Sequence, residues 1–182
     1  MSNNNKIMKY TLFLLALGLI AGFLLGFVNS ITAPIIKERA QAEAEAALKE
    51  YYVYAGYSGS HIDEFEIDDS RIADIYKTYD ENDNVTSIVY KTVAKGFSSD
   101  VVSYVEIKAD GTFGKTIMIA HGDTPSYANP VKDHDFGITD ASIDKYSPVL
   151  SGASYTSGAV IEGIHAAAAH FKDNKVKLLE AR

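Results

Sequence analysis

Residues 72–93, IADIYKTYDENDNVTSIVYKTV, decide the fold class of this chain. Residues 72–79 and 85–93 are rich in β-branched and aromatic side chains, and a polar turn at residues 80–84 separates them. Runs of this composition bounded by Asn, Asp and Gly are typical of antiparallel hairpins. The stretch therefore predicts two neighbouring antiparallel strands.

The same pattern continues along the chain. Residues 101–108 and 112–120 are two more such runs, and turns that contain Gly96 and Gly111 precede them. An Ala-rich stretch at residues 157–171 has the period of a helix. The apolar positions on one face of that helix are Val160, Ile161, Ile164 and Ala168. We therefore expect an α+β domain with an antiparallel sheet and flanking helices.

The remaining segments are expected to be less regular. Pro34 marks the end of an apolar N-terminal run, and residues 35–49, rich in Ala and Glu, predict a separate helix after it. Residues 51–60, rich in Tyr and Gly, and the acidic residues 61–69 are expected to be surface connections. Residues 121–130 are too polar and Pro-rich to predict regular structure.

The N-terminal part of the chain predicts one transmembrane helix. No charged residue occurs in residues 10–36, and a spanning helix needs about 20 apolar residues. A cleaved signal peptide is the alternative, but its apolar region is normally about 7 to 15 residues long. We expect an uncleaved single-pass anchor in the inner or plasma membrane, with the N-terminus in the cytoplasm. The expected divisions are residues 1–36 for the tail and anchor, 37–60 for a connecting helix and linker, and 61–182 for an extracytoplasmic soluble domain.

Charge and cysteine content exclude several classes of function. The formal net charge is −7, so no nucleic-acid partner is expected, because binding to a phosphate backbone needs clustered Lys and Arg. The chain has no Cys, which removes disulfides, thiolate metal sites and iron–sulfur clusters held by this chain. No metal site is expected, and any redox chemistry has to come from a bound organic cofactor.

A cluster of hydroxyl side chains directly precedes the Ala-rich helix. The sequence of residues 151–157 is SGASYTS. Unpaired backbone N–H groups and the positive end of the macrodipole favour a phosphate at a helix N-terminus. Ser and Thr are also preferred as ordinary N-caps, whether or not a ligand binds. Taken alone, these residues favour the ordinary helix cap over the phosphate site.

The order of these motifs resembles a known family. An anchor, an Ala- and Glu-rich helix, antiparallel strands, the loop HGDTPSYA at residues 121–128 and SGAS at residues 151–154 follow one another. Over nearly the whole chain this order is similar to the FMN-binding G subunit of the Rnf ion-translocating ferredoxin:NAD oxidoreductase, and to the C subunit of the sodium-pumping NADH:quinone oxidoreductase. The resemblance implies an FMN-binding domain at residues 61–182. In that family the FMN phosphate is esterified to the last Thr of Ser/Thr-Gly-Ala-Thr, which implies covalent FMN at Ser154.

The resemblance also implies the other residues of the site. Thr156 is the second candidate for attachment. The loop after the last strand would meet the ribityl chain and the edge of the isoalloxazine, and Tyr155 or Tyr127 would cover a ring face. No catalytic residue is expected, because the flavin carries the electron chemistry. The expected FMN-binding residues are Ser151, Gly152, Ala153, Ser154, Tyr155, Thr156, Asp123, Thr124 and Tyr127.

On this resemblance the chain is expected to be an electron-relay subunit of an ion-translocating oxidoreductase, without independent catalysis. Its expected partners are the other membrane subunits of the redox complex, membrane lipid, and an FAD-dependent FMN transferase during maturation. Two alternatives stay open. Pro148, Ser126 and Ala128 replace an Asp and two Gly of the family pattern, which fits a flavin-free anchored structural or binding module of the same fold. The other alternative is an anchored extracytoplasmic flavin reductase.

Overall fold

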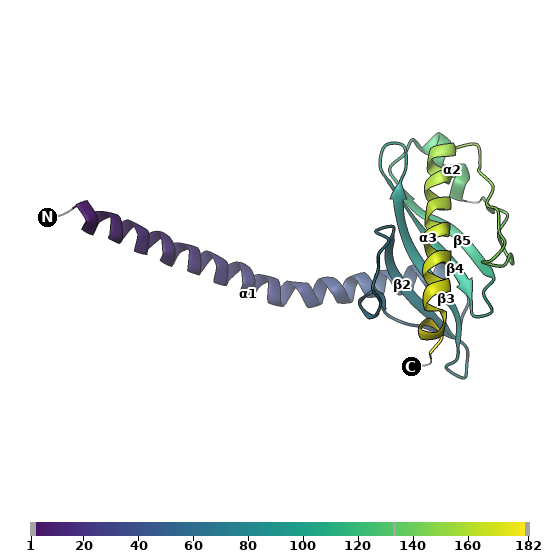
Figure 1. Ribbon diagram of the computed structural model, residues 1–182, viewed down its shortest axis with the longest axis horizontal. Helices are drawn as coiled ribbons and strands as arrows, with labels where there is room; N and C mark the ends of the chain where they lie inside the picture. Colours follow the sequence, from purple (N-terminus) through teal and green to yellow (C-terminus); the bar gives the residue numbers. More distant parts are fainter. Residues whose placement is uncertain (1–2, 133, 181–182) are drawn as a thin grey trace. The chain divides into compact units, whose positions relative to one another are not determined.

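The computed structural model describes residues 3–132 and 134–180. The chain divides into two units, Met1–Ala44 and Glu45–Arg182. It is α+β, as predicted, with an N-terminal apolar helix followed by a domain built on an antiparallel sheet. The elements are α1 (Asn3–Tyr51), β1 (Gly56–Tyr57), η1 (Ile62–Glu64), β2 (Ile72–Tyr79), β3 (Val85–Lys95), β4 (Asp100–Lys108), β5 (Phe113–His121), α2 (Pro125–Lys132) and α3 (Ser154–Leu178) (Figure 1).

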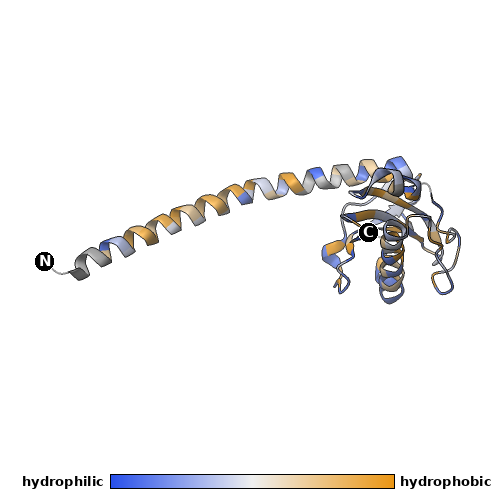
Figure 2. Ribbon diagram, turned by 90° about the horizontal axis from the view of Figure 1, so that it is seen from above, coloured by the Kyte–Doolittle hydropathy of each residue, from blue (hydrophilic) through white to orange (hydrophobic). Residues whose placement is uncertain are grey.

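Helix α1 contains an apolar stretch that is long enough to cross a membrane. This stretch, Met8–Ile36, has 29 residues. At a rise of about 1.5 Å per residue it is about 44 Å long, which exceeds the roughly 30 Å apolar core of a bilayer. Its side chains are exposed, and Figure 2 shows hydrophobic residues along this part of the helix. Among the described residues, this is the one helix whose length and composition suit a membrane span.

Pro34 does not end the helix, which corrects the prediction from the sequence. Helix α1 continues through this residue from Asn3 to Tyr51. Proline removes one backbone hydrogen bond from a helix interior, and apolar helices tolerate this where hydroxyl side chains bond to the backbone nearby. One turn before Pro34, the hydroxyls of Ser30 and Thr32 donate to the carbonyls of Phe27 and Val28, both at 2.8 Å.

The sheet is an antiparallel meander in the order β1-β2-β3-β4-β5. The four predicted strands are confirmed, with bounds that differ by at most two residues. Strands β3 and β4 pair without interruption, from Ser87 opposite Lys108 to Lys95 opposite Asp100. Register shifts interrupt the pairing of β2 with β3 and of β4 with β5. The longest regular part of the sheet therefore lies at its centre and ends at the turn between β3 and β4.

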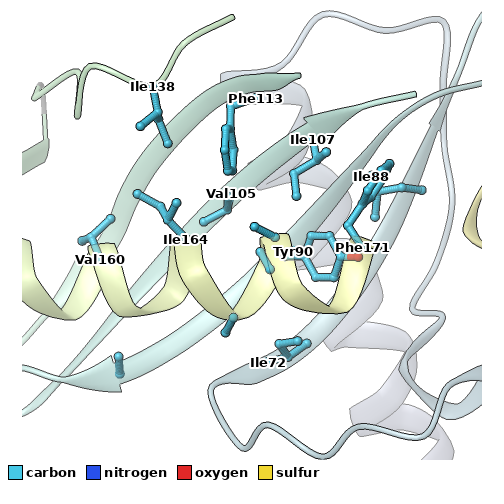
Figure 3. Close-up of a cluster of buried hydrophobic side chains, with 14 of the residues drawn as sticks. Ile72, Ile88, Tyr90, Val105, Ile107, Phe113, Ile138, Val160, Ile164 and Phe171 are labelled. Atoms are coloured by element: carbon cyan, nitrogen blue, oxygen red, sulfur yellow. The ribbon is translucent and has the colours of Figure 1, made fainter. Parts of the chain in front are cut away.

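Helix α3 covers one face of the sheet and buries the core. It packs mainly on β3 and β4. Figure 3 shows Val160, Ile164 and Phe171 among strand side chains that include Ile88 and Val105, and all five are buried. The predicted apolar face of the helix is confirmed, and its length is greater than predicted at both ends.

The segment at residues 51–60 is more ordered than predicted. It contains β1, which pairs antiparallel with β2. Tyr52 is buried, and its hydroxyl donates to the carbonyl of Lys115 at 2.9 Å. The Tyr54 hydroxyl donates to the carboxylate of Glu106. A two-residue strand carries too little pattern to be predicted, and partners so distant in sequence make the ordering a tertiary effect.

The segment at residues 121–130 also differs from the prediction, because it contains the start of α2. This helix begins at Pro125. Proline suits the first helical position, where its φ is already correct and the missing N–H would have no partner. Ala128 and Val131 are fully buried, and α2 packs on β5 and α3. Packing of this small apolar face holds a helix that the polar composition of the segment does not predict.

Candidate functional site

Helix α3 begins inside the hydroxyl cluster. It starts at Ser154, three residues before the predicted start, so Ser154, Tyr155 and Thr156 form its first turn. The N-cap residue is Ala153, and it makes no side-chain cap hydrogen bond. The interpretation of the cluster as an ordinary helix cap is therefore wrong. Because the first N–H groups of a helix lack partners within it, this helix end can bind an anion.

A cavity of about 390 Å³ opens at this end of α3. Its volume falls in the range of about 300 to 1,000 Å³ that is typical of small-molecule and cofactor sites. Three segments that are distant in the sequence form its wall: the turn between β3 and β4, the loop after β5, and the start of α3. The lining residues are Phe97, Asp123, Thr124, Gly152, Ala153, Ser154, Tyr155 and Thr156.

The carboxylate of Asp123 ties these three segments together. Its Oδ1 accepts the backbone N–H of Ser98 at 2.7 Å and the Ser98 hydroxyl at 3.1 Å. Its Oδ2 accepts the backbone N–H of Phe97 at 3.2 Å and the hydroxyl of Thr156 at 2.7 Å. The residue is 5% exposed. We call this set of contacts, from Asp123 to Phe97, Ser98 and Thr156, the Asp123 clasp. Through these contacts the carboxylate holds the three segments of the cavity wall together.

Hydrogen bonding keeps the carboxylate of Asp123 ionised. The bonds, led by the backbone N–H of Ser98, hold the pKa of Asp123 well below its usual range, against the opposing effect of burial. The absence of a side chain at Gly96 makes the close approach possible. A Cβ atom there would lie 2.6 Å from Oδ2 of Asp123 and 2.8 Å from the carbonyl oxygen of Ser99. A larger residue at position 96 would therefore push the turn and the carboxylate apart.

The three hydroxyls predicted for this site differ in their surroundings. Ser154 is exposed and lines the cavity. Thr156 is 3% exposed, and its hydroxyl is used by the Asp123 clasp. The Oγ atom of Ser151 is buried and has no hydrogen-bond partner among the residues that the structure describes, which is unusual because buried polar groups are normally paired. Ser154 therefore has the accessible hydroxyl, and the hydroxyl of Ser151 is available to form a hydrogen bond with a bound group.

The electrostatics of the cavity come from one carboxylate and one helix end. The described residues that line it include no Lys, Arg or His, and Asp123 is the ionised side chain among them. The positive potential comes from the N-terminus of α3, whose macrodipole favours negative groups. An anion bound here is therefore attracted by backbone N–H groups and repelled by the Asp123 carboxylate.

Most residues predicted for the site are brought to this cavity. Ser151 precedes the lining residues directly in the sequence. Tyr127 belongs to α2 by its backbone, and its side chain lies outside the described part of the chain. The predicted residues that line the cavity are Asp123, Thr124, Gly152, Ala153, Ser154, Tyr155 and Thr156.

The structure adds two residues that the sequence did not single out. Phe97 lines the cavity, and Ser98 donates to Asp123 through both its N–H and its hydroxyl. Both lie in the turn between β3 and β4, far from the loop and the helix start in the sequence. A large aromatic residue in an otherwise polar hairpin turn was the available signal for Phe97, whereas the role of Ser98 depends on tertiary contacts.

A second cavity, of about 360 Å³, lies along β5 and is separate from this site. It contains none of the predicted residues. Its lining is mixed in charge and includes Lys115, Lys132 and Asp135. The cavity at the start of α3 is therefore the candidate site.

Comparison with known proteins identifies the part of the chain that holds this cavity. Residues 96–169 match a family model described as FMN-binding domain. This range begins at Gly96 and contains every residue that lines the cavity. A search of curated proteins found no match. The domain match supports FMN as the cofactor and a flavin-binding electron-transfer role.

Proposed function

We propose that this chain is a membrane-anchored flavoprotein subunit that relays electrons through covalently bound FMN in an Rnf-type ion-translocating ferredoxin:NAD oxidoreductase. The proposal starts from the FMN-binding domain match at residues 96–169. The observation that carries it is the position of Ser154. The exposed residue lines the cavity at the uncapped start of α3, within the matched range.

Ser154 is the attachment residue in this proposal. Its Oγ atom would bond to the phosphorus of FMN while the transferase breaks the pyrophosphate bond of FAD, so that AMP leaves and the hydroxyl proton is released. Ser keeps the hydroxyl group that the family's Thr supplies. Thr156 is the weaker candidate, because its buried hydroxyl donates to Asp123 at 2.7 Å. Esterification of Thr156 would break the Asp123 clasp.

The residues around Ser154 fit a phosphate group. The N–H groups in the first turn of α3 have no side-chain cap, and they and the macrodipole favour a phosphate oxygen. The unpaired hydroxyl of Ser151 is a further donor close in the sequence. At Gly152 the space that a Cβ atom would face is open, with no atom within 4 Å. These features leave the backbone accessible to a bulky group on Ser154.

Electrostatics favour a covalent bond over simple binding. Free FMN has a phosphate monoester, which carries about 1.5 to 2 negative charges at neutral pH. No basic side chain is found among the described residues that line the cavity, and the ionised Asp123 would repel this group. Esterification to Ser154 makes a phosphodiester with one negative charge and also prevents dissociation. The cavity is therefore better suited to a tethered FMN than to a free one.

The protein and the flavin have separate tasks in this proposal. Bound FMN supplies the redox chemistry, and the chain attaches, orients and shields it. The helix at residues 8–36 keeps the carrier near its partner subunits, which raises their effective concentration. That helix has no charged residue between positions 10 and 36 and so offers no ion path. Ion translocation therefore belongs to the other membrane subunits.

The proposed topology is that of a single-pass membrane anchor. The chain would lie in the inner or plasma membrane with its N-terminus in the cytoplasm and the FMN-binding domain outside. The FAD-dependent transferase would act on the same side as this domain, since it has to reach Ser154. The other membrane subunits and lipid are the remaining partners, and neither independent catalysis nor nucleic-acid binding is part of the proposal.

Production of the full-length chain together with an active FMN transferase tests the proposal. Mass spectrometry is expected to find an FMN phosphoryl group on the peptide that contains Ser154. Ultraviolet fluorescence of the denatured protein in a gel is expected to disappear in Ser154→Ala and to persist in Ser154→Thr, which keeps a hydroxyl. The second variant is the matched control, because it changes the same position without removing the nucleophile.

Two outcomes would contradict this proposal. An unmodified wild-type peptide from a host with an active transferase would favour the flavin-free module instead. Fluorescence that persists in Ser154→Ala and is lost in Thr156→Ala would move the attachment to Thr156.

A further inference from the structure

Phe97 is a large apolar side chain that the fold leaves uncovered. It lies in the turn between β3 and β4, lines the cavity at the start of α3, and is 70% exposed. A ring that contributes to the core would be buried, because burial of apolar area is what stabilises a fold. At this exposure most of the Phe97 ring is free to contact a group bound in the cavity.

Hydrogen bonds hold the backbone around Phe97 in place, although the side chain of Phe97 is exposed. The Phe97 N–H donates to Oδ2 of Asp123 at 3.2 Å, and the Ser98 N–H donates to Oδ1 at 2.7 Å. The N–H of Gly96 donates to the carbonyl of Ser99 at 2.9 Å and closes the turn. The Asp123 clasp thus fixes the point from which the ring extends. Aromatic side chains on a preorganised backbone bind ligands at a low cost in conformational entropy.

A second exposed ring lies beside Phe97. Tyr155, in the first turn of α3, is 69% exposed. The ring centroids of Phe97 and Tyr155 are 5.4 Å apart, and the ring planes are tilted by 59°. At this angle the two rings touch without forming a closed stack, so they make an aromatic wedge at the cavity. Tyr155 directly follows Ser154, which places the wedge one residue from the proposed attachment oxygen.

We propose that Phe97 is a flavin-binding residue whose ring stacks on the isoalloxazine of the FMN attached to Ser154, with Tyr155 on the other side of the wedge. This inference rests on the proposed function. Aromatic rings stack favourably at centroid distances of about 4.5 to 7 Å, and both side chains are exposed enough to turn about their own bonds. In this arrangement the Asp123 clasp acts on the cofactor indirectly, by positioning the wall on which the flavin lies.

The test compares how well the attached flavin is shielded from solvent. Full-length, FMN-loaded wild type and Phe97→Ala are purified in the same detergent, and iodide quenching of the native flavin fluorescence is measured. We expect the quenching constant to rise about two-fold in Phe97→Ala, because one of two aromatic walls is lost. Phe97→Tyr keeps a ring and is expected to match the wild type. Val176→Ala is the control, since it removes an 81% exposed apolar side chain near the other end of α3.

The amount of attached FMN in each sample, read from fluorescence in denaturing gels, separates the possible failures. A wild type without FMN would refute the proposed function, and this inference with it. Phe97→Ala with attached FMN and an unchanged quenching constant would refute the stacking role while the proposed function stands. Phe97→Ala without FMN would also refute it, because the side chain would then serve attachment.

Discussion

Replacement of Asp123 by Asn is expected to destabilise the domain by about 2 to 4 kcal/mol, because it breaks a buried set of hydrogen bonds without changing the side-chain volume. The carboxylate of Asp123 accepts two bonds on each oxygen at 3.2 Å or less, from Ser98, Phe97 and Thr156. An amide has one acceptor oxygen, so its NH₂ group has to face donors on one side.

The magnitude follows from the donors that lose their acceptor. If the NH₂ group replaces Oδ2, the backbone N–H of Phe97 is left unpaired, whereas the hydroxyl of Thr156 can rotate. If it replaces Oδ1, the backbone N–H of Ser98 is unpaired. An unsatisfied buried group costs about 1 to 3 kcal/mol, and loss of the charge weakens the bonds that remain. The sum is about 2 to 4 kcal/mol for either orientation of the amide.

Urea denaturation of the full-length chain in detergent measures this change. Tyrosine fluorescence is a suitable signal, because the chain has 12 Tyr and no Trp. The protein is produced without the transferase, so that flavin neither quenches the signal nor stabilises the fold. Asp100→Asn is the matched control. Asp100 lies at the same turn but is exposed, with Lys95 at 3.7 Å, and such pairs contribute about 0 to 1 kcal/mol.

The reasoning would be refuted if Asp123→Asn lay within about 0.5 kcal/mol of the wild type, which is the range of ordinary surface substitutions. Equal losses in Asp123→Asn and Asp100→Asn would also refute it, because they would show that charge at the turn matters and the buried bonds do not.

Two further predictions concern the same domain. The pKa of Asp123 is lowered by folding, so its stabilisation is present above the unfolded value of about 3.9 and is lost as pH falls through the folded value. The difference in stability between wild type and Asp123→Asn should therefore narrow as pH falls below about 4, and a constant difference would contradict the assignment. Gly163→Ala should destabilise the domain by about 1 to 3 kcal/mol in the same urea assay, because the new Cβ atom would lie 2.4 Å from Oγ1 of Thr92. Gly158→Ala, where nothing lies within 4 Å, should be neutral or stabilising by up to about 1 kcal/mol, and equal losses at both positions would exclude the steric explanation.

The elements that were predicted correctly are those that local sequence determines. Strands β2 to β5 follow one another as hairpins, so composition and turn residues were enough to predict each strand and its neighbour. The apolar run in α1 is recognisable by length alone. The errors occurred where packing outweighs local preference. Strand β1 has two residues that pair with β2, and α2 forms in a polar, Pro-rich segment because Ala128 and Val131 are buried.

At the candidate site, too, local sequence determined some features and tertiary packing determined others. The SGASYTS stretch by itself favoured a helix cap over a phosphate site, and the resemblance to a flavoprotein family supplied the candidate residues Asp123, Thr124 and Tyr127. The structure decided against the helix cap by starting α3 at Ser154 with Ala153 as an N-cap that makes no side-chain bond. It also distinguished Ser154 from Thr156 by burial and hydrogen bonding.

The sequence by itself determined the membrane-length helix, the α+β class and the identity of the hydroxyl groups, because hydropathy, hairpin composition and side-chain chemistry are local properties. Only the tertiary structure decided that the hydroxyl of Ser154 is accessible, that the carboxylate of Asp123 is used in hydrogen bonds that hold the fold, and that Phe97 lines the cavity. The physical reason is that the Asp123 clasp joins residues 97–98, 123 and 156. Contacts between such distant positions exist only after the sheet and α3 have packed together.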